Sequence, residues 1–248
     1  GKGSVSRMIS CILDKSGFKT GIYSSPHIID FRERIETPEG FCPEEIYEKA
    51  IREMVPRIES ILPEQLPGGR GLTWFELVTL FGFLCFRHAQ IEWGVFEVGM
   101  GGRLDSTNII TPKISCINVI ELEHTEYLGD TVEKIAFEKA GIIKEGVPVL
   151  VAHQQYESVN EVFKKVAEEK HAQIYFVDDL ISAMDYKINS MGLMEINIES
   201  KLFSRPLHTV MPMLGIMQLQ NAAMASLAVK LILPETDEKT IEKGLSNA

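Results

Sequence analysis

Glu97 stands where a predicted apolar strand meets a glycine-rich turn. The strand is predicted over 93–96, and glycines follow at positions 99, 101 and 102. Open α/β sheets bind ligands outside the carboxyl ends of their parallel strands, so Glu97 is placed to offer a carboxylate to a metal ion. The glycines would let the backbone approach a ligand closely. The alternative interpretation is a plain glycine-rich turn with a capped glutamate.

The first four residues have the types found in a phosphate-binding loop. Gly1, Lys2, Gly3 and Ser4 lead straight into a helical pattern that Gly17 ends. In such loops backbone N–H groups and the helix N-terminus face phosphates, and the lysine supplies a positive charge. We therefore expect nucleotide phosphates here.

A second polar loop follows the strand predicted over 19–23. Ser25 is a candidate metal ligand through its hydroxyl, and Arg32 and Arg34 are candidate anion contacts. A Ser-Pro turn followed by solvated charges is the alternative interpretation.

His124 comes just after a strand predicted over 114–119, at the sheet edge where Glu97 is expected. A histidine in this position could also be an ordinary hydrogen-bonded polar residue. Its proximity to Glu97 favours a role in the same site.

Composition restricts the class of protein. The chain has 248 residues, 45% of them apolar, and a net charge of -10, which argues against nucleic acid as a partner. No run of about 18 apolar residues exists, so we expect no membrane span. The cysteines are widely spaced in apolar stretches, which predicts buried thiols in a reducing compartment and neither zinc nor disulfides. They are Cys11, Cys42, Cys85 and Cys116.

The pattern of elements predicts an α/β fold: one doubly wound, mostly parallel sheet over 1–248, with antiparallel edge strands between about 181 and 211. Pro56 should kink or split the helix predicted over 43–61. Thr73 and Glu76 have the spacing of a capping box, and Asp130 with Glu133 should cap a later helix. Further strands are predicted over 147–151 and 173–177, and further helices over 73–86, 157–170, 214–232 and 238–245.

Taken in order, these motifs resemble the folylpolyglutamate synthase/dihydrofolate synthase family of Mur-ligase-like ATP-dependent amide ligases. Residues 1–4 are similar to the end of its Gly-Thr-Asn-Gly-Lys-Gly-Ser loop, and 23–35 to its Tyr-Thr-Ser-Pro-His…Phe-x-Glu-Arg-Ile segment. Further similar segments are 72–76, 97–108, 124–129 and 138–144. The chain departs from the family at Glu123, usually Asp, and at Met217, usually His. By comparison with the family pattern, we expect residues 1–248 to be the ATP-binding ATPase domain. The start of the phosphate loop and a C-terminal glutamate-ligase domain are expected to lie outside the chain.

The resemblance implies that ATP phosphorylates a carboxylate of a folate or of dihydropteroate, and that the amino group of L-glutamate attacks the acyl phosphate. It implies ATP and two Mg²⁺ ions as cofactors. The implied metal ligands are Ser25, Glu97, His124 and Lys139, of which the last three are also the implied catalytic residues. The implied nucleotide contacts are Gly1, Lys2, Gly3, Ser4 and Asn221. The implied pterin or folate contacts are Thr73, Leu104, Asp105 and Ser106.

Lys139 needs separate treatment because an ammonium group cannot ligate a cation. The resemblance implies that CO₂ carbamylates it, which turns it into an anionic oxygen ligand. Without the resemblance, Lys139 would be an exposed lysine favoured by the dipole at a helix C-terminus.

Two other functions remain open. One is another Mur-type ligase that joins an amino acid to a cell-wall precursor, and the other is a nucleotide-binding module without ligase chemistry. The loop 24–27 and the Gly-Gly-Arg-Leu-Asp run at 101–105 favour folate. We expect a monomeric cytoplasmic enzyme whose partners are small molecules, with no nucleic acid or membrane partner.

Overall fold

The computed structural model describes the backbone of residues 1–248 and every side chain except the one at position 67. Its helices are α1 (Lys2–Lys15), α2 (Glu44–Glu59), α3 (Trp74–His88), α4 (Thr125–Leu128), α5 (Val132–Ala140), α6 (Glu157–Glu169), α7 (Val177–Leu180), α8 (Ile216–Ile232) and α9 (Glu238–Ser246). Its strands are β1 (Thr20–Tyr23), β2 (Ile35–Thr37), β3 (Gly40–Phe41), β4 (Trp93–Phe96), β5 (Ser115–Ile117), β6 (Val149–Val151), β7 (Ile174–Phe176), β8 (Ile181–Ile188), β9 (Met194–Ser200) and β10 (Leu207–Met211). Two short 3₁₀ helices matter for the site: η1 (Phe31–Arg34) and η4 (Ser106–Ile109).

The first sheet contains β4, whose carboxyl end leads into Glu97. Its strand order is β3-β2-β1-β4, and β1 pairs parallel to β4 with Gly21 opposite Gly94. Helix α3 packs closely on this sheet: a Cβ at Gly21 would lie 2.7 Å from the Phe86 ring, and one at Gly82 would lie 2.7 Å from the Tyr23 ring. Glycine at both positions lets the helix and the strand approach each other.

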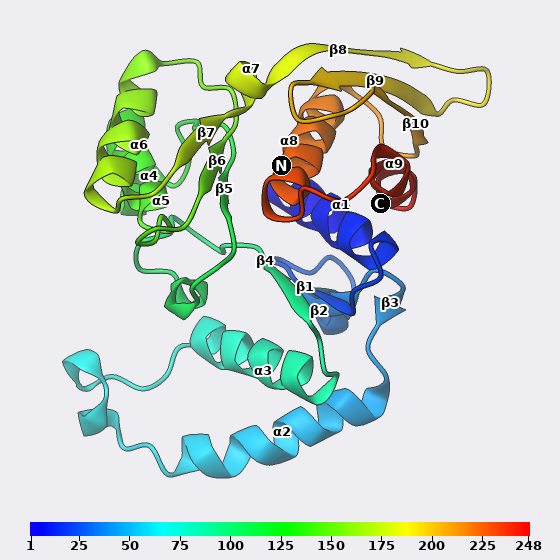
Figure 1. The fold of residues 1–248 in the computed structure, drawn as a ribbon. Helices are drawn as coiled ribbons and strands as arrows, with labels where there is room; N and C mark the ends of the chain where they lie inside the picture. The colour runs from blue at the N-terminus through cyan, green and yellow to red at the C-terminus, as the bar shows by residue number, and fades with distance from the viewer.

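The second sheet is parallel and has the order β5-β6-β7. Helices α5 and α6 accompany it on one side of the molecule (Figure 1). Val149, Val151 and Phe163 are fully buried in the hydrophobic cluster between them. The alternation of strand and helix predicted from the sequence produces this unit.

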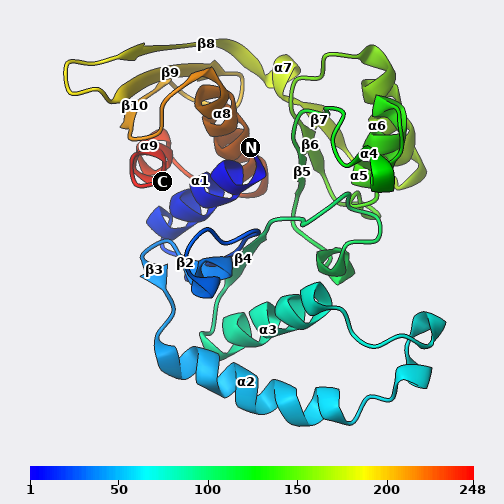
Figure 2. The same cartoon turned by 180° about the vertical axis from the view of Figure 1, so that it is seen from behind.

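The third sheet is antiparallel, with the order β10-β9-β8. Helices α1, α8 and α9 lie together beneath it, and both chain ends lie close to this group (Figures 1 and 2). The largest hydrophobic cluster joins these elements, and it includes Ile12, Ile196 and Leu227, all with no exposed surface.

The predicted α/β fold class is confirmed, including the antiparallel strands after residue 180. The parallel strands, however, form two hydrogen-bonded sheets and not one. Val95 of β4 and Cys116 of β5 pack against the same hydrophobic cluster. Side-chain packing therefore joins the two sheets where no ladder of backbone hydrogen bonds does.

Two local predictions need correction. Helix α2 is continuous through Pro56, so the predicted split does not occur. Proline removes a single backbone N–H, and only the last three residues of the helix follow Pro56. The N-cap of α5 is Thr131, which accepts a hydrogen bond from the N–H of Lys134. Asp130 instead forms a 2.7 Å ion pair with Lys134 on the surface.

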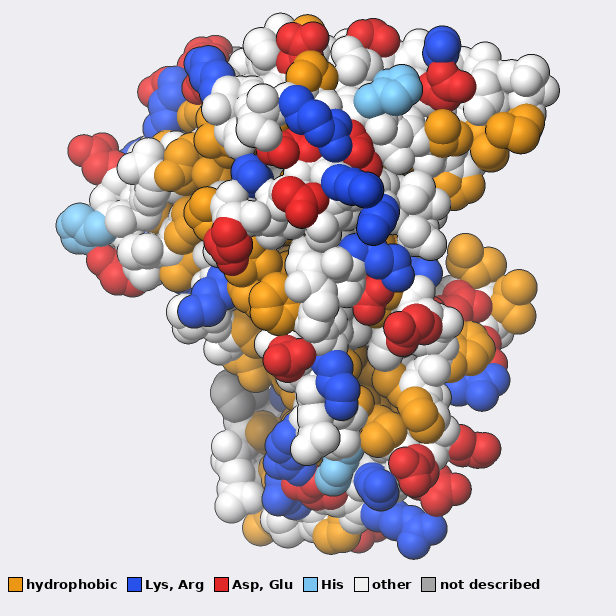
Figure 3. Space-filling model, turned by 45° about the vertical axis from the view of Figure 1, so that its right-hand side comes forward, with side chains coloured by type: hydrophobic (Ala, Val, Ile, Leu, Met, Phe, Trp, Pro, Cys, Tyr) orange, Lys and Arg blue, Asp and Glu red, His pale blue; other side chains and the backbone are white. Residues whose placement is uncertain are grey.

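The surface is mixed in character. On the face drawn in Figure 3, acidic and basic side chains are interspersed, and hydrophobic side chains are exposed between them. Among the residues whose structure is described, no helix is long and apolar enough to span a bilayer.

Candidate active site

Glu97 is a buried carboxylate at the carboxyl end of β4. Only 7% of the residue is exposed, and its backbone N–H donates to the carbonyl of Tyr23 at 2.8 Å. The backbone N–H of Ser25 donates to Oε2 of Glu97 at 3.3 Å, and a Cβ at Gly3 would lie 3.5 Å from the same oxygen. Three segments predicted to share a site, those of Gly3, Ser25 and Glu97, therefore meet around one carboxylate.

The protonation of Glu97 reflects this burial. Burial removes the carboxylate from water and raises the pKa of Glu97, while the hydrogen bond from the N–H of Ser25 and the charge of Lys2 lower it. Among the described residues, Ser25 is the one protein donor to this carboxylate. A buried carboxylate with so few protein partners is suited to a bound cation.

The residues predicted to bind phosphate form the start of α1. The helix begins at Lys2, with Gly1 as its N-cap, so Lys2 lies in the first turn and not in a loop before it. Gly1 and Gly3 are exposed, while Lys2 and Ser4 are half-buried. The helix therefore presents free N–H groups and a lysine beside Glu97, an arrangement suited to an anion.

The glycine-rich turn is organised by Asp105. Its Oδ2 accepts hydrogen bonds from the N–H groups of Gly99 and Met100, both at 3.1 Å. Its Oδ1 accepts from the N–H and the hydroxyl of Thr107 at 2.9 and 2.6 Å. In this structure Asp105, which was predicted to contact the substrate, therefore stabilises the conformation of the loop. The neighbouring Leu104 is 80% exposed, and Ser106 begins η4, half-buried.

The start of α3 adjoins this loop. Thr73 is the N-cap: its hydroxyl accepts from the N–H of Glu76 at 3.2 Å, and its N–H donates to the Glu76 carboxylate at 2.7 Å, so the predicted capping box is confirmed. A Cβ at Gly99 would lie 2.6 Å from the ring of Phe75. The predicted pterin-site residues Thr73, Asp105 and Ser106 thus come from two adjacent segments.

Lys139 lies in the last turn of α5 and is only 13% exposed. Its Nζ donates to Oε1 of Glu123 at 2.6 Å, and this hydrogen bond lowers the pKa of Glu123. The glycine-rich turn packs on the same part of α5, since a Cβ at Gly102 would lie 3.0 Å from the carbonyl oxygen of Lys139. Lys139 is therefore a half-buried, paired residue and not an exposed one.

His124 and Asn221 occupy different surroundings. His124 is exposed at the N-cap of α4, with a left-handed backbone (φ 50°), and no hydrogen bond of its ring is among those described. Asn221 is 5% exposed on α8, and its Nδ2 donates to Oε1 of Gln218 at 3.0 Å. Neither residue contacts the Glu97 carboxylate through a described hydrogen bond.

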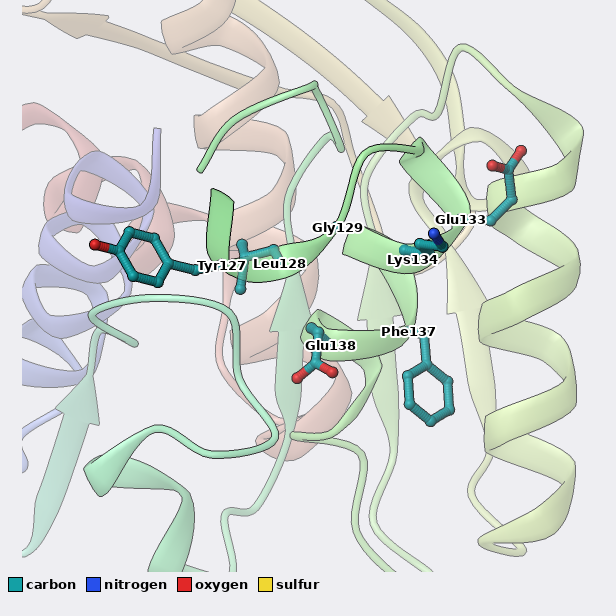
Figure 4. Close-up of a pocket in the computed structure, with 7 residues that line it drawn as sticks. All are labelled: Tyr127, Leu128, Gly129, Glu133, Lys134, Phe137 and Glu138. Atoms are coloured by element: carbon teal, nitrogen blue, oxygen red, sulfur yellow. The ribbon is translucent and has the colours of Figure 1, made fainter. Parts of the chain in front are cut away.

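A shallow pocket lies between α4 and α5, next to His124 and Lys139 in sequence. Its lining side chains, which include Tyr127, Glu133 and Phe137, point in different directions and do not converge (Figure 4). Its lining includes neither His124 nor Lys139. The polar groups that converge are those around Glu97, outside this pocket.

Two hydrogen-bond partners of predicted site residues were not singled out from the sequence: Glu123, the partner of Lys139, and Gln218, the partner of Asn221. Glu123 was noted only as a departure from a family pattern, and its position before His124 was the available signal. Gln218 was visible only as the residue after Met217. Within the described part of the chain, no three His, Cys, Asp or Glu residues are grouped as a metal site. A metal ion at Glu97 would therefore need hydroxyl, water or phosphate oxygens as further ligands.

Known proteins place this arrangement in a family. The Mur ligase middle domain family matches residues 76–229, so the chain belongs to that family. The dihydrofolate synthase/folylpolyglutamate synthase of Bacillus subtilis is 33% identical over 254 residues, covering 100% of this chain and 57% of that protein. This similarity confirms the resemblance found in the sequence.

Solved structures agree. The apo form of the L. casei folylpolyglutamate synthase superposes with a TM-score of 0.89 at 30% identity, covering 98% of this chain and 59% of that one. A folylpolyglutamate synthase in complex with AMPPCP and folate gives a TM-score of 0.89 at 29% identity, covering 98% and 59%. The chain spans little more than half the length of these relatives.

Proposed function

We propose that this chain supplies the ATP-binding part of a ligase that joins L-glutamate to a folate or to dihydropteroate through an acyl phosphate. The observation that carries the proposal is the meeting of the α1 N-terminus, Ser25 and buried Glu97, in a chain similar along its whole length to folylpolyglutamate synthases. A similar protein has been solved with an ATP analogue and folate together.

In this proposal the start of α1 binds the nucleotide. Gly1, Gly3 and Ser4 offer backbone N–H groups to the phosphates, and Lys2 adds a positive charge. Asn221 would contact the nucleotide from α8, which packs in the same hydrophobic cluster as α1. Binding both phosphate and acceptor carboxylate brings anions together, so positioning and charge neutralisation are the main tasks of the site.

The Glu97 carboxylate and the Ser25 hydroxyl would hold one Mg²⁺. These hard oxygen donors fit a metal that prefers oxygen and completes its shell with water and phosphate. Bound there, Mg²⁺ would neutralise phosphate charge and polarise the transferred phosphoryl group.

Lys139 and His124 would serve a second Mg²⁺, with Lys139 as a carbamate. To form the carbamate, the Lys139 ammonium first loses a proton to solvent, and the lone pair of the neutral nitrogen then bonds to the carbon of CO₂. A second proton leaves that nitrogen for solvent, which gives an uncharged N–H and an anionic carboxylate. The carbamate is negatively charged, so Glu123, which now pairs with the ammonium, would be repelled by it. The side chain of Glu123 is 45% exposed and therefore has solvent into which to turn.

The acceptor would bind beside the glycine-rich turn, near Thr73, Leu104, Asp105 and Ser106. Asp105 shapes that turn, and Leu104 offers an exposed apolar side chain to a pterin ring. The monomeric state and the cytoplasmic location remain predictions from the sequence.

The proposal is tested by following phosphate release and glutamate incorporation in the natural-length protein. We expect both to require ATP, L-glutamate and either dihydropteroate or folate. Turnover only with a cell-wall precursor would identify a different Mur-type ligase. ATP hydrolysis at a rate that does not change when any acceptor is added would identify a nucleotide-binding module instead.

A further inference from the structure

Arg34 is a buried arginine whose guanidinium pairs with no carboxylate among the described residues. It is 6% exposed, its Nε donates to Nδ1 of His27 at 2.7 Å, and its Cζ lies 4.7 Å from the centre of the Trp74 ring. These contacts fix the plane of the guanidinium, while neither Nη group has a described protein acceptor. Buried arginines are normally paired, so this one is prepared for an anion from outside the chain.

The two nearest acidic residues in the loop are engaged elsewhere. Asp30 forms a 2.7 Å ion pair with Arg32, which holds the pKa of Asp30 at about 2. Glu33 accepts the N–H groups of Ile28, Ile29 and Asp30 at 2.7 to 3.0 Å, and these bonds lower its pKa. Neither carboxylate therefore neutralises Arg34.

Arg34 also lies close to the proposed centre. Its carbonyl oxygen accepts the N–H of Ser24 at 3.0 Å, and the next residue, Ser25, donates to Glu97. On its other side, Trp74 directly follows Thr73 at the start of α3. Arg34 is thus situated between the proposed metal ligands and the proposed pterin site.

The surroundings of Arg34 favour an aromatic acid. Trp74 is 55% exposed and Phe31 is 37% exposed, and the centres of their rings are 6.2 Å apart in an edge-to-face arrangement. An aromatic ring of a ligand could pack on these faces while its carboxylate reaches the free edge of the guanidinium.

From this geometry we infer that Arg34 binds the carboxylate of the acceptor substrate. The inference rests on the proposed function and adds the residue that binds this group. His27 is a positioning residue here, since it accepts the Nε hydrogen and leaves both Nη groups for the ligand.

The test compares two ligands of nearly the same shape: pteroate, which carries a carboxylate, and its uncharged primary carboxamide. Their binding to the natural-length protein would be measured by calorimetry for the wild type, Arg34→Gln, Arg34→Lys and the control Arg52→Gln, at an exposed position on α2. We expect the wild type to prefer the acid by about ten- to a hundredfold, as for charge-assisted hydrogen bonds. Arg34→Gln should bind acid and amide alike, Arg34→Lys should keep part of the preference, and Arg52→Gln should match the wild type. Unchanged binding of a non-hydrolysable ATP analogue would show that each variant is folded.

Other results would overturn the inference. Equal weakening of acid and amide in Arg34→Gln would show that Arg34 only packs the loop, and an undiminished preference for the acid would show that another group binds the carboxylate. In both cases acid binding by the wild type would leave the proposed function standing. If the wild type bound neither pteroate nor folate, the proposed function would fail and the inference with it.

Discussion

The ammonium nitrogen of Lys139 lies 2.6 Å from Oε1 of Glu123, which ties the last turn of α5 to the segment just before α4. Lys139 is the more buried partner, 13% exposed against 45% for Glu123. The pair keeps Lys139 at the edge where the glycine-rich turn packs on α5. An ammonium group at Lys139 forms this pair, whereas a carbamate would repel Glu123. The pair therefore bears on whether Lys139 acts as a cation or as a carbamate.

Substitution of Lys139 distinguishes these roles. In the natural-length protein, Lys139→Ala should be nearly inactive, and acetate or formate should restore part of the activity by supplying the missing carboxylate oxygens. Lys139→Arg keeps a positive charge but cannot form the same carbamate, so it should be as inactive as Lys139→Ala. The measurement is the rate of glutamate incorporation with and without added carboxylate. Normal turnover by Lys139→Arg would show that the residue acts only as a cation.

Glu97→Gln should separate catalysis from stability. The substitution keeps the shape of the side chain but removes the charge proposed to balance Mg²⁺, so the rate should fall at least ~100-fold. Near-normal turnover at saturating Mg²⁺ would remove Glu97 from the metal site.

The stability of Glu97→Gln relative to the wild type should depend on pH in the ligand-free protein. Burial raises the folded-state pKa of Glu97 above its ordinary value of 4.5, so the folded state holds its proton more tightly than the unfolded state does. Stability from this group is present below pH 4.5 and is lost as the pH rises through the folded-state pKa. Thermal melting without metal should therefore give Glu97→Gln a Tm relative to wild type that increases from pH 4 to pH 7. A relative Tm that decreases over this range would contradict the raised pKa.

Asp105→Asn should loosen the glycine-rich turn. An amide nitrogen in place of Oδ2 would face the N–H groups of Gly99 and Met100, so two donors would lose their acceptor. We expect a loss of ~1–3 kcal/mol in the free energy of unfolding, seen as a lower denaturant midpoint. Asp179→Asn, at an exposed position on α7, is the matched control and should change stability little. Equal midpoints for the two variants would show that the Asp105 contacts do not stabilise the fold.

The 248-residue polypeptide should fold but should not ligate on its own. It contains three well-packed hydrophobic clusters, yet it spans only 57% of the Bacillus subtilis relative. We expect a cooperative unfolding transition and no incorporation of glutamate. Appreciable ligation by this polypeptide would show that its residues suffice for the reaction.

The meeting of Gly3, Ser25 and Glu97 was predictable because the ends of parallel strands share an edge, and apolar runs locate those ends. The Lys139–Glu123 pair was not predictable, because it depends on how two side chains reach across 16 residues of sequence. Arg32 and Arg34 looked equivalent in the sequence. On the 3₁₀ turn η1 one pairs with Asp30 and the other is buried against Trp74, which only the three-dimensional structure could show.

The ends of helices could also be predicted only in part from the sequence. The capping box at Thr73 was predicted because both partners lie in one local motif. The choice of Thr131 over Asp130 as the cap of α5 depends on backbone dihedral angles that the residue types leave open, since both types are good N-caps.

The four hydrogen bonds to Asp105 bear on how quickly a ligand can bind. A turn rich in glycine would ordinarily sample many shapes and would lose that freedom only when a ligand arrived. Here the carboxylate has already ordered the turn during folding. Association at this edge of the molecule need not wait for the turn to close, so encounter and docking, and not rearrangement of the turn, should set its rate.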